Sequence, residues 1–401
     1  MKKIKVAVIG GGAAGFFAAI SCKQHHPEAE VHLLEKSDKL LAKVKVSGGG
    51  RCNVTNATFT VSELIKNYPR GGNKLKKIFS QFNTQDTFDW FFNRGIKLKT
   101  EPDNRVFPVT DNSQTIINCL MEEAAHLGII IKKQFPVNSI IKEDDYFLIN
   151  SELKYNKVII ATGGNPKIEN YNWLKELGHN IIPPVPSLFT FNLPGEKIRE
   201  LMGVVAEPAK VSIAGTGLNY TGPLLITHWG MSGPAVLKLS AFGARILNEM
   251  NYNFTIRVSW AGDINEDTLR ELISEKTEEG GKKKIINFNP VNLPARLWLF
   301  LLAKININEN IPWNELNKKD KNRLVNLLLN DEYYAKGKTT FKEEFVTAGG
   351  VDLADMDMET MQSRKCEGLY FAGEVLDIDG ITGGFNFQAA WSTGYIAGKL
   401  L

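Results

Sequence analysis

Residues 5–24, KVAVIGGGAAGFFAAISCKQ, decide the fold of this chain. An apolar run ends at Gly10, and the pattern Gly10-x-Gly12-x-x-Gly15 opens an alanine-rich segment that is typical of a helix. Gly10 permits a tight turn, Gly12 lets the backbone approach a pyrophosphate, and Gly15 allows the helix to pack closely on the strand. The start of the helix adds unpaired N–H groups and a partial positive charge. The stretch therefore predicts the first half of a dinucleotide-binding β-α-β unit.

A second strand supports this prediction. VHLLE (31–35) is apolar up to Glu35, which lies twenty residues after Gly15. A carboxylate at this spacing accepts hydrogen bonds from an adenosine ribose, and an acid rather than an arginine favours a ribose without a 2′-phosphate. The spacing is equally consistent with NAD and with FAD.

Two distant segments favour FAD. Residues 157–164, KVIIATGG, form an apolar strand after short alternating strands that are typical of a β-meander. Residues 368–398 give a strand, Glu374, a glycine pair and a closing helix. Glu374 would bind ribityl hydroxyls. The amides near Phe387 and Gln388 would face the flavin N1–C2=O edge, where a helix N-terminus stabilises the negative charge of the reduced form. An NAD-dependent dehydrogenase does not need this C-terminal segment.

A set of motifs carries a resemblance to one family. The motifs are GGGAAG (10–15), SGGGRCNVTN (47–56), THWGMSGPA (227–235), VTAGGVDL (346–353) and GLYFAGEVLDIDGITGGFNFQ (368–388). The chain resembles the BaiN/aminoacetone-oxidase-like family of bacterial flavoproteins, which is distantly related to the fumarate reductase and L-aspartate oxidase flavoproteins. The resemblance covers essentially the whole chain. It implies one FAD per subunit on a Rossmann-like domain, in a family that includes an oxidase of a small aminoketone and a reductase of bile-acid intermediates.

The second glycine cluster, at 48–50, is interpreted as a continuation of the first. Its glycines would allow the backbone to run along the cofactor toward the ribityl chain and the flavin. Arg51 and Asn53 would supply polar contacts or hold the shape of the loop, and Lys43 would add positive charge near the phosphates. Cys52 has two interpretations. An adjacent cation such as Arg51 lowers a thiol pKa and favours redox chemistry, whereas packing or a weak contact to the cofactor needs no such activation.

The predicted FAD contacts come from the first and last parts of the chain. They are Gly10, Gly12, Ala13, Ala14, Gly15, Glu35, Lys36, Lys43, Gly49, Gly50, Arg51, Cys52, Asn53, Val137, Ala161, Thr162, Gly163, Gly373, Glu374, Gly384, Asn386, Phe387 and Gln388. No metal ligands are expected, because the cysteines and histidines lack ligand spacing.

Catalytic candidates are few. Besides Cys52, His228 lies in the family-like loop THWGMSGPA. Histidine side chains in general titrate near neutral pH, so His228 could serve as an acid or base, as a substrate contact, or as a brace of its loop. Arg105, in DNRVFPVTD, could bind an anionic group or form a salt bridge within a turn.

The predicted fold class is α/β: a Rossmann-like FAD-binding domain, with a mostly parallel sheet and a β-meander, interrupted by two inserts. The FAD domain is expected at 1–186 and 342–401, a β-rich insert at 187–262 and a helical insert at 263–341. Prolines in IIPPVPSLFTFNLP suggest a boundary near 184–188. The helical pattern is expected to run from Asn265 to about Lys338.

Composition limits the partners and the location. The net charge is +4 and is spread along the chain, without the clustered basic face of a nucleic-acid-binding protein. The four cysteines lie far apart without CxxC spacing, which favours a reducing compartment. No stretch reaches the roughly 18 apolar residues of a membrane helix. We expect a cytoplasmic protein that acts on a small-molecule substrate, without nucleic acid or membrane; its oligomeric state is left open.

The sequence thus predicts an FAD-dependent oxidoreductase in which a small organic substrate or NAD(P)H delivers a hydride to the flavin. Oxygen or an unsaturated compound would then take the electrons. AGTGLN (214–219) lacks the third glycine of a dinucleotide motif, so NAD(P)H would bind only transiently. Two alternatives stay open: an NAD-dependent dehydrogenase, and a flavin-containing redox-sensing or binding protein without fast turnover.

Overall fold

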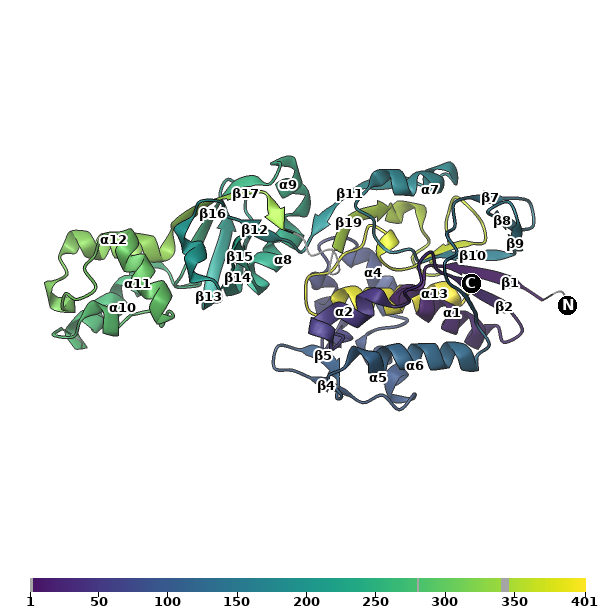
Figure 1. Cartoon of the computed structure of the whole chain (residues 1–401), viewed down its shortest axis with the longest axis horizontal. Coiled ribbons are helices and arrows are strands. Elements are labelled where there is room, and N and C mark those ends of the chain that lie inside the picture. The colour runs from purple at the N-terminus through teal and green to yellow at the C-terminus, as the bar shows by residue number, and fades with distance from the viewer. Residues whose placement is uncertain (1–2, 280, 340–345) are drawn as a thin grey trace. The chain divides into compact units, whose positions relative to one another are not determined.

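The computed structural model describes residues 3–279, 281–339 and 346–401. By its internal contacts the chain divides into two compact units. One unit is formed by Met1–Ser187 with Phe341–Leu401, and the other by Leu188–Thr340. Figure 1 traces both units from the N-terminus in purple to the C-terminus in yellow.

A five-stranded parallel sheet forms the centre of the first unit, in the order β20-β10-β1-β2-β6. The strands are β20 (Leu369–Phe371), β10 (Lys157–Ile160), β1 (Lys5–Ile9), β2 (Glu30–Leu34) and β6 (Ile130–Lys132). Val8, Leu33 and Ile159 are fully buried, as expected for strands of a sheet that is covered on both faces. Helix α1 (Ala13–His25) joins β1 to β2. The predicted α/β class with a parallel sheet is therefore confirmed.

Two smaller sheets complete the strands around this centre. The predicted meander leads into β10 and consists of β7 (Ile140–Lys142), β8 (Phe147–Ile149) and β9 (Leu153–Tyr155). The other sheet has the order β3-β5-β4, with β3 (Thr55–Asn56), β4 (Leu98–Thr100) and β5 (Arg105–Pro108). The longer helices around them are α2 (Ala42–Gly50), α4 (Gly72–Phe79), α5 (Thr84–Phe92) and α6 (Ser113–His126), and the shorter ones are α3 (Val61–Leu64) and α7 (Asn172–Glu176).

The C-terminal helix α13 (Phe385–Gly398) lies directly on α1 (Figure 1). A Cβ atom on Gly394 would lie 2.5 Å from the carbonyl oxygen of Ala14, and one on Gly398 would lie 2.5 Å from that of Ala18. The hydroxyl of Ser21 donates to the carbonyl of Tyr395 at 2.5 Å. Glycines at these two positions therefore let the two helix backbones touch.

Two paired strands flank the second unit in sequence. β11 (Ile181–Ser187) pairs antiparallel with β19 (Val346–Val351), although β11 contains three prolines. The sheet has only two strands, so prolines without N–H groups are tolerated on its edges. The proline-rich stretch that suggested a boundary is thus a strand, and the first of the two segments that form the first unit ends at Ser187.

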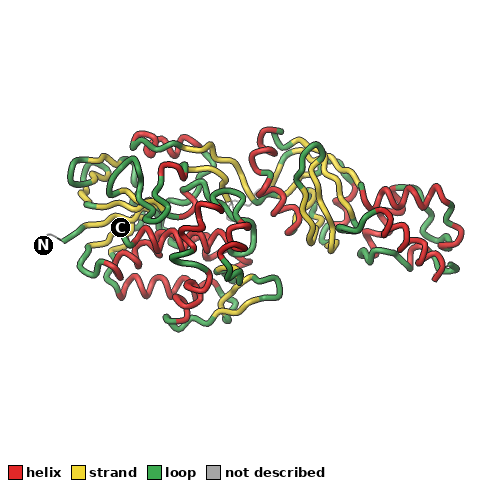
Figure 2. Tube along the Cα trace, turned by 180° about the vertical axis from the view of Figure 1, so that it is seen from behind, coloured by secondary structure: helices red, strands yellow, loops and turns green. Residues whose placement is uncertain are grey.

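The second unit is built on a seven-stranded antiparallel sheet in the order β17-β16-β13-β14-β15-β12-β18. Its strands are β12 (Thr190–Asn192), β13 (Val205–Ile213), β14 (Asn219–Ile226), β15 (Gly230–Ser232), β16 (Asn253–Ser259), β17 (Asp331–Lys336) and β18 (Lys338–Thr339). Helices α8 (Pro234–Phe242), α9 (Ala244–Glu249), α10 (Glu266–Glu279), α11 (Ala295–Lys304) and α12 (Lys318–Leu329) accompany the sheet, and Figure 2 shows them in red beside the yellow strands. One hydrophobic core joins the sheet to α10, α11 and α12.

The helical pattern expected to reach about Lys338 ends earlier. Helix α12 stops at Leu329, and β17 follows at Asp331. Along DEYYAK the residues are alternately buried and exposed, with Tyr333 and Ala335 in the core. This two-residue period belongs to a strand, and it was too short to stand out beside the leucine-rich helix before it.

The most apolar stretch of the sequence, residues 297–303, lies within α11. Its Leu297, Leu301 and Leu302 are buried in the core of the second unit. Throughout the described residues, none of the helices has both the length and the apolar character needed to cross a bilayer.

The contact between α1 and α13 gives a first prediction. Alanine in place of glycine inside a helix normally stabilises a protein by about 1 kcal/mol. At Gly394 we expect the opposite, a loss of about 2 kcal/mol, because the added methyl group collides with the Ala14 carbonyl. Denaturant unfolding followed by circular dichroism measures the change.

Gly217→Ala is the matched control for Gly394→Ala. In the described part of the chain no atom lies within 4 Å of the position that a Cβ on Gly217 would take. We expect its free energy of unfolding to stay within about 0.5 kcal/mol of the parent value. A Gly394→Ala protein as stable as this control would contradict the proposed packing.

Candidate functional site

The first glycine loop has three glycines with three different surroundings. Gly10 has a φ of 115°, and a Cβ there would lie 2.3 Å from the carbonyl oxygen of Ala161 at the end of β10. A Cβ on Gly15 would lie 1.9 Å from the carbonyl oxygen of Gly10. Around Gly12, by contrast, no described atom lies within 4 Å of a Cβ position. Gly10 and Gly15 are thus required by the fold, whereas Gly12 leaves an open space at the N-terminus of α1.

Glu35 closes this loop from the end of β2. One carboxylate oxygen accepts the N–H of Gly11 at 2.8 Å, and the other accepts the N–H and the hydroxyl of Ser37, both at 2.8 Å. A carboxylate oxygen has two lone pairs, so the first oxygen keeps capacity for a ligand hydroxyl. The neighbouring Lys36 is exposed.

The second glycine loop ends α2 in a left-handed conformation. Gly48, Gly49 and Gly50 have φ values of 58°, 70° and 85°, which residues other than glycine rarely adopt. A Cβ on Gly48 would lie 2.8 Å from the Phe107 ring, whereas the Cβ positions of Gly49 and Gly50 have no described atom within 4 Å. The loop therefore leaves its outer face free for a close approach.

Arg51 is engaged by the protein itself. Its guanidinium lies over the Phe107 ring, 3.9 Å from the ring centroid, and pairs with the carboxylate of Glu101 at 2.6 Å. Arg105 pairs with Glu101 at 3.1 Å and with Asp103 at 2.6 Å. Arg105 thus forms the turn salt bridges that were its simpler interpretation, and Arg51 braces the base of the second glycine loop.

Cys52 is a buried thiol with a left-handed backbone, at a φ of 64°. Burial raises its pKa to about 12, against a small opposing effect of a hydrogen bond with Ser47. At neutral pH the group is therefore a thiol and not a nucleophilic thiolate. This environment favours the packing role of Cys52 over the redox role.

Asn53 links the second loop to the start of α13. In the amide orientation that satisfies its neighbours, it accepts the N–H of Gly384 at 3.0 Å and donates to the carbonyl of Thr55 at 2.9 Å. A Cβ on Gly384 would lie 2.3 Å from the Thr55 carbonyl oxygen. Gly384, which caps the N-terminus of α13, therefore lies against the second glycine loop.

The N–H groups at the start of α13 differ from the expectation in one position. The N–H of Gln388 donates to the Gly384 carbonyl at 3.0 Å, and its side-chain oxygen accepts the hydroxyls of Thr55 and Thr87 at 2.6 and 3.0 Å. The groups without an intrahelical acceptor are therefore those of 385–387, one residue earlier. The side chain of Asn386 makes two 2.8 Å hydrogen bonds to the backbone of Gly380 and so braces the preceding loop.

Glu374 and Lys43, predicted separately, lie in contact. Glu374 belongs to a short 3₁₀ turn, Gly373–Val375, directly after β20. Its Oε2 accepts from Lys43 Nζ at 2.6 Å, and its Oε1 accepts the N–H of Thr347 at 2.9 Å. Gly373 faces α1, because a Cβ there would lie 2.8 Å from the Cβ of Ala14. The C-terminal segment thus meets the first glycine loop.

Four further predicted residues lie in loops of the first unit. Ala161 and Gly163 follow β10, Gly163 with an open Cβ position among the described atoms, and Thr162 is exposed. Val137 is half-buried in the segment between β6 and β7.

His228 lies in the second unit, between β14 and β15. Its side chain is exposed, and its ring lies 4.1 Å from that of Trp229, centroid to centroid. Its carbonyl accepts from the guanidinium of Arg199 at 2.7 Å. That bond holds the loop backbone without using the imidazole, so the interpretations of the His228 side chain as an acid or base, a substrate contact or a loop brace stay predictions.

Sequence reasoning did not single out Thr347 or Gly164. Gly164 follows the carboxyl end of β10 and lies against Glu374. Thr347, in β19, contacts the same carboxylate. The motif VTAGGVDL contained the signal for Thr347, but nothing local distinguished its threonine from a strand residue that only packs.

These residues fit a flavin dinucleotide. The open positions at Gly12, Gly49 and Gly163 are cradles that a side chain would fill, and the starts of α1 and α13 offer backbone donors in the same unit. Glu35 and Glu374 provide acceptors for hydroxyl groups at the ends of β2 and β20. The donor set is that of a phosphate- and sugar-containing ligand.

Comparison with known proteins decides the family. A family model described as the HI0933-like protein Rossmann domain matches residues 4–400. The chain belongs to this HI0933-like family. Membership confirms the resemblance drawn from the motifs and makes the chain an FAD-dependent oxidoreductase.

Two relatives match this HI0933-like protein over nearly its whole length but at low sequence identity. The 3-dehydro-bile acid delta(4,6)-reductase of Clostridium scindens is 26% identical, and the match covers 98% of each protein. The ribosomal RNA dihydrouridine synthase of Escherichia coli is 28% identical, over 98% of this chain and 97% of that protein.

Solved structures share the fold. The 3-ketosteroid delta1-dehydrogenase from Sterolibacterium denitrificans has a TM-score of 0.51 at 12% identity, and the match covers 99% of each chain. The FrdA chain of the quinol fumarate reductase from Escherichia coli has a TM-score of 0.50 at 15% identity, over 100% of this chain and 70% of that one. At these identities the likeness concerns the fold alone.

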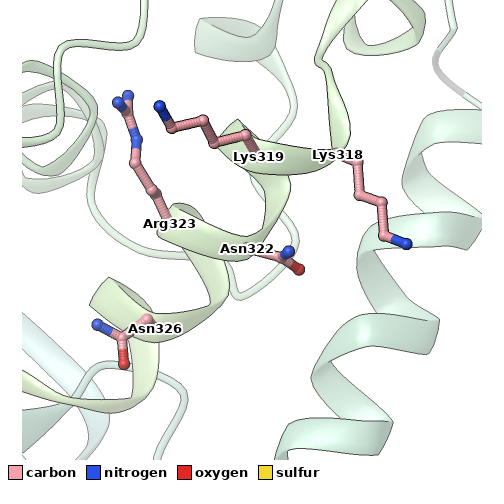
Figure 3. A pocket seen from close by; sticks show the side chains of 5 residues that line it. All are labelled: Lys318, Lys319, Asn322, Arg323 and Asn326. Atoms are coloured by element: carbon pink, nitrogen blue, oxygen red, sulfur yellow. The ribbon is translucent and has the colours of Figure 1, made fainter.

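A pocket in the second unit has a different character. It has a volume of about 580 Å³ and is lined by Lys318, Lys319, Asn322, Arg323 and Asn326, all on α12 (Figure 3). Lys319 and Arg323 extend to one side of the helix and Lys318 to the other (Figure 3). Both lysines are exposed, and Arg323 pairs with Asp320 at 3.2 Å. The pocket is therefore a solvated helix face of the second unit.

A matched pair of glycine variants tests the cradle. Gly12→Ala adds a methyl group to the open space, so we expect FAD affinity to fall about tenfold or more, with the unfolding free energy of the flavin-free protein changed by about 1 kcal/mol at most. Gly15→Ala should instead destabilise the flavin-free protein by about 2 kcal/mol or more, because the methyl group meets the Gly10 carbonyl. Flavin-fluorescence titration and denaturant unfolding separate the effects. Normal FAD binding by Gly12→Ala would refute the assignment.

Thiol chemistry tests the role of Cys52. All four cysteines are free and buried, and burial raises the pKa of Cys22 and Cys52 to about 12 and that of Cys119 to about 11. A pKa of about 12 leaves roughly one thiolate in ten thousand at pH 8. We therefore expect an aromatic disulfide reagent to react only slowly with the folded protein. After denaturation the same reagent should react with all four thiols. Rapid native labelling mapped to Cys52 would restore its redox role.

Proposed function

We propose that this HI0933-like protein is an FAD-dependent reductase of a carbon–carbon double bond conjugated to a carbonyl group in a small organic molecule. FAD, when bound, supplies the two-electron chemistry, by accepting a hydride and passing it on. The donor would be NAD(P)H, bound only transiently, and the acceptor would be the unsaturated compound rather than oxygen.

The observation that carries the proposal is the convergence of two cradles in one unit. Gly373 and α13 pack on α1, so the loop suited to a pyrophosphate and the helix start suited to a flavin edge are held together. An NAD-dependent dehydrogenase would use the first cradle alone. The second cradle supports a flavin dinucleotide, whose length from the dimethylbenzene ring to the adenine would extend over both cradles.

The names of two relatives favour an activated double bond. A 3-dehydro-bile acid delta(4,6)-reductase acts, by its name, on double bonds near a 3-keto group, and a dihydrouridine synthase saturates the uracil bond next to a carbonyl. The two products differ in size and kind, so their common element is the polarised double bond. Only this element is carried over to the present chain.

The chain's own residues would serve this chemistry by placement and charge. N–H groups of 385–387 at the start of α13 would stabilise negative charge on the reduced flavin ring, as a helix N-terminus does. Glu374 and Glu35 would hold sugar and ribityl hydroxyls, and Asn53 would keep the α13 cap in place. His228 is the proposed proton donor or substrate contact. The free, buried cysteines suit work in the cytoplasm.

Anaerobic half-reactions of the purified yellow protein test the proposal. NADH and NADPH are added first, and bleaching of the visible flavin absorbance is followed. The reduced protein is then mixed with a 4,6-dien-3-one steroid, with its saturated ketone, and with an isolated alkene. We expect the conjugated ketone to reoxidise the flavin at least about tenfold faster than either control, because only it can delocalise the charge left by the hydride. Mass spectrometry should show two added hydrogen atoms.

Other results would redirect the assignment. Reoxidation by oxygen alone, with release of peroxide after reduction by an amine, would make the protein an oxidase. A flavin that is reduced once and accepts no second substrate would support a redox-sensing protein. Saturation of uridine within ribosomal RNA, tested in a parallel reaction, would keep the bond chemistry but overturn the small-molecule substrate.

A further inference from the structure

The carboxylate of Glu374 is held differently at its two oxygens. Oε1 accepts a backbone N–H, that of Thr347, at 2.9 Å. Oε2 accepts from Lys43 Nζ at 2.6 Å. The Glu374 side chain is 18% exposed, whereas the Lys43 side chain is 48% exposed. Oε1 is thus fixed by buried backbone, and Oε2 is bound by a long side chain that can exchange with a ligand.

The hydroxyl of Thr347 is buried beside this carboxylate. Thr347 is 0% exposed, and within the described residues its Oγ1 has no hydrogen-bond partner. Buried hydroxyls nearly always have a partner, since burial without one costs the full desolvation of the group. If Thr347 only filled space, a valine of the same shape would fill it equally well, so the buried hydroxyl requires an explanation.

Gly164 shows where the hydroxyl lies. A Cβ on Gly164 would lie 2.7 Å from Thr347 Oγ1 and 2.7 Å from Glu374 Oε1. The hydroxyl and the carboxylate oxygen therefore approach the same point beside Gly164.

We propose that Thr347 is a positioning residue for FAD binding: through Oε1 it fixes the carboxylate of Glu374, so that Oε2 is presented to a hydroxyl of the cofactor. The inference rests on the proposed FAD site. In the flavin-free protein Lys43 occupies Oε2. A cofactor hydroxyl would take the place of Lys43 at Oε2, and the Thr347 hydroxyl would then donate to Oε1 beside the backbone N–H.

Two donors on one oxygen have a physical consequence. In the loaded protein both donors would hold the carboxylate in the orientation that presents Oε2 to the cofactor hydroxyl. The hydroxyl gains its hydrogen bond only in the loaded protein. Thr347 should therefore contribute to FAD affinity without contributing to the stability of the flavin-free protein.

Isosteric variants separate positioning from packing. Thr347→Val keeps the shape and the backbone N–H but removes the hydroxyl. We expect its FAD dissociation constant, measured by fluorescence titration of flavin-free protein, to rise about tenfold. The melting temperature of the flavin-free protein should stay the same or increase, because a buried hydroxyl without a partner is lost. Thr347→Ser should restore FAD affinity to within about threefold of the parent.

Two further measurements complete the test. In a Glu374→Ala protein, Thr347→Val should have no further effect on FAD affinity, because the threonine acts through that carboxylate. Thr277→Val is the matched control, since the Thr277 hydroxyl donates to the Ile273 carbonyl at 2.7 Å within α10 of the second unit. Its FAD affinity should equal that of the parent.

Contrary outcomes are distinct. A Thr347→Val protein with a lower melting temperature and unchanged FAD affinity would make Thr347 a packing residue. Additive losses with Glu374→Ala would also overturn the inference, because the two residues would then act independently. Only flavin binding and unfolding are measured, so absence of the proposed double-bond reduction would leave this test valid.

Discussion

The structure of the first unit depends on backbone contact between α1 and α13. Gly394 and Gly398 face the carbonyls of Ala14 and Ala18, so successive turns of one helix meet successive turns of the other in the same order. The two helices therefore run in the same direction, although they come from opposite ends of the chain. Their N-termini carry partial positive charge of the same kind. A contact without intervening side chains fixes the spacing between these two charged ends more tightly than side-chain packing would.

The strands that lead into and out of the second unit also end at the cofactor segment. The hydroxyl of Ser187, at the end of β11, donates to Asp379 at 2.7 Å, and the backbone N–H of Thr347, at the start of β19, donates to Glu374. Burial raises the pKa of Asp379, and its ion pair with Arg70 opposes that shift. Both acids belong to the stretch GEVLDID, so the chain leaves and re-enters the first unit bound to the same loop.

Features that depend on the backbone could be read from the sequence, and those that depend on distant side chains could not. Gly10, Gly15 and the closing helix were predictable because tight turns and close approach restrict the residue type. The engagement of Gln388 by two threonines was not, since Thr55 and Thr87 become its neighbours only after folding. The strand β17 was hidden by the helix before it. Sequence reasoning placed the cofactor segments, and the structure supplied the partners that orient their side chains.

The site combines two kinds of donor with different consequences. Backbone N–H groups at the starts of α1 and α13 are fixed by the helices and cannot turn toward other acceptors. Side chains such as Arg51 and Lys43 are already paired with Glu101 and Glu374, so a ligand must exchange with these pairs rather than add to them. The position of a dinucleotide is therefore set by the backbone donors, whereas its affinity also depends on the side-chain pairs that it displaces.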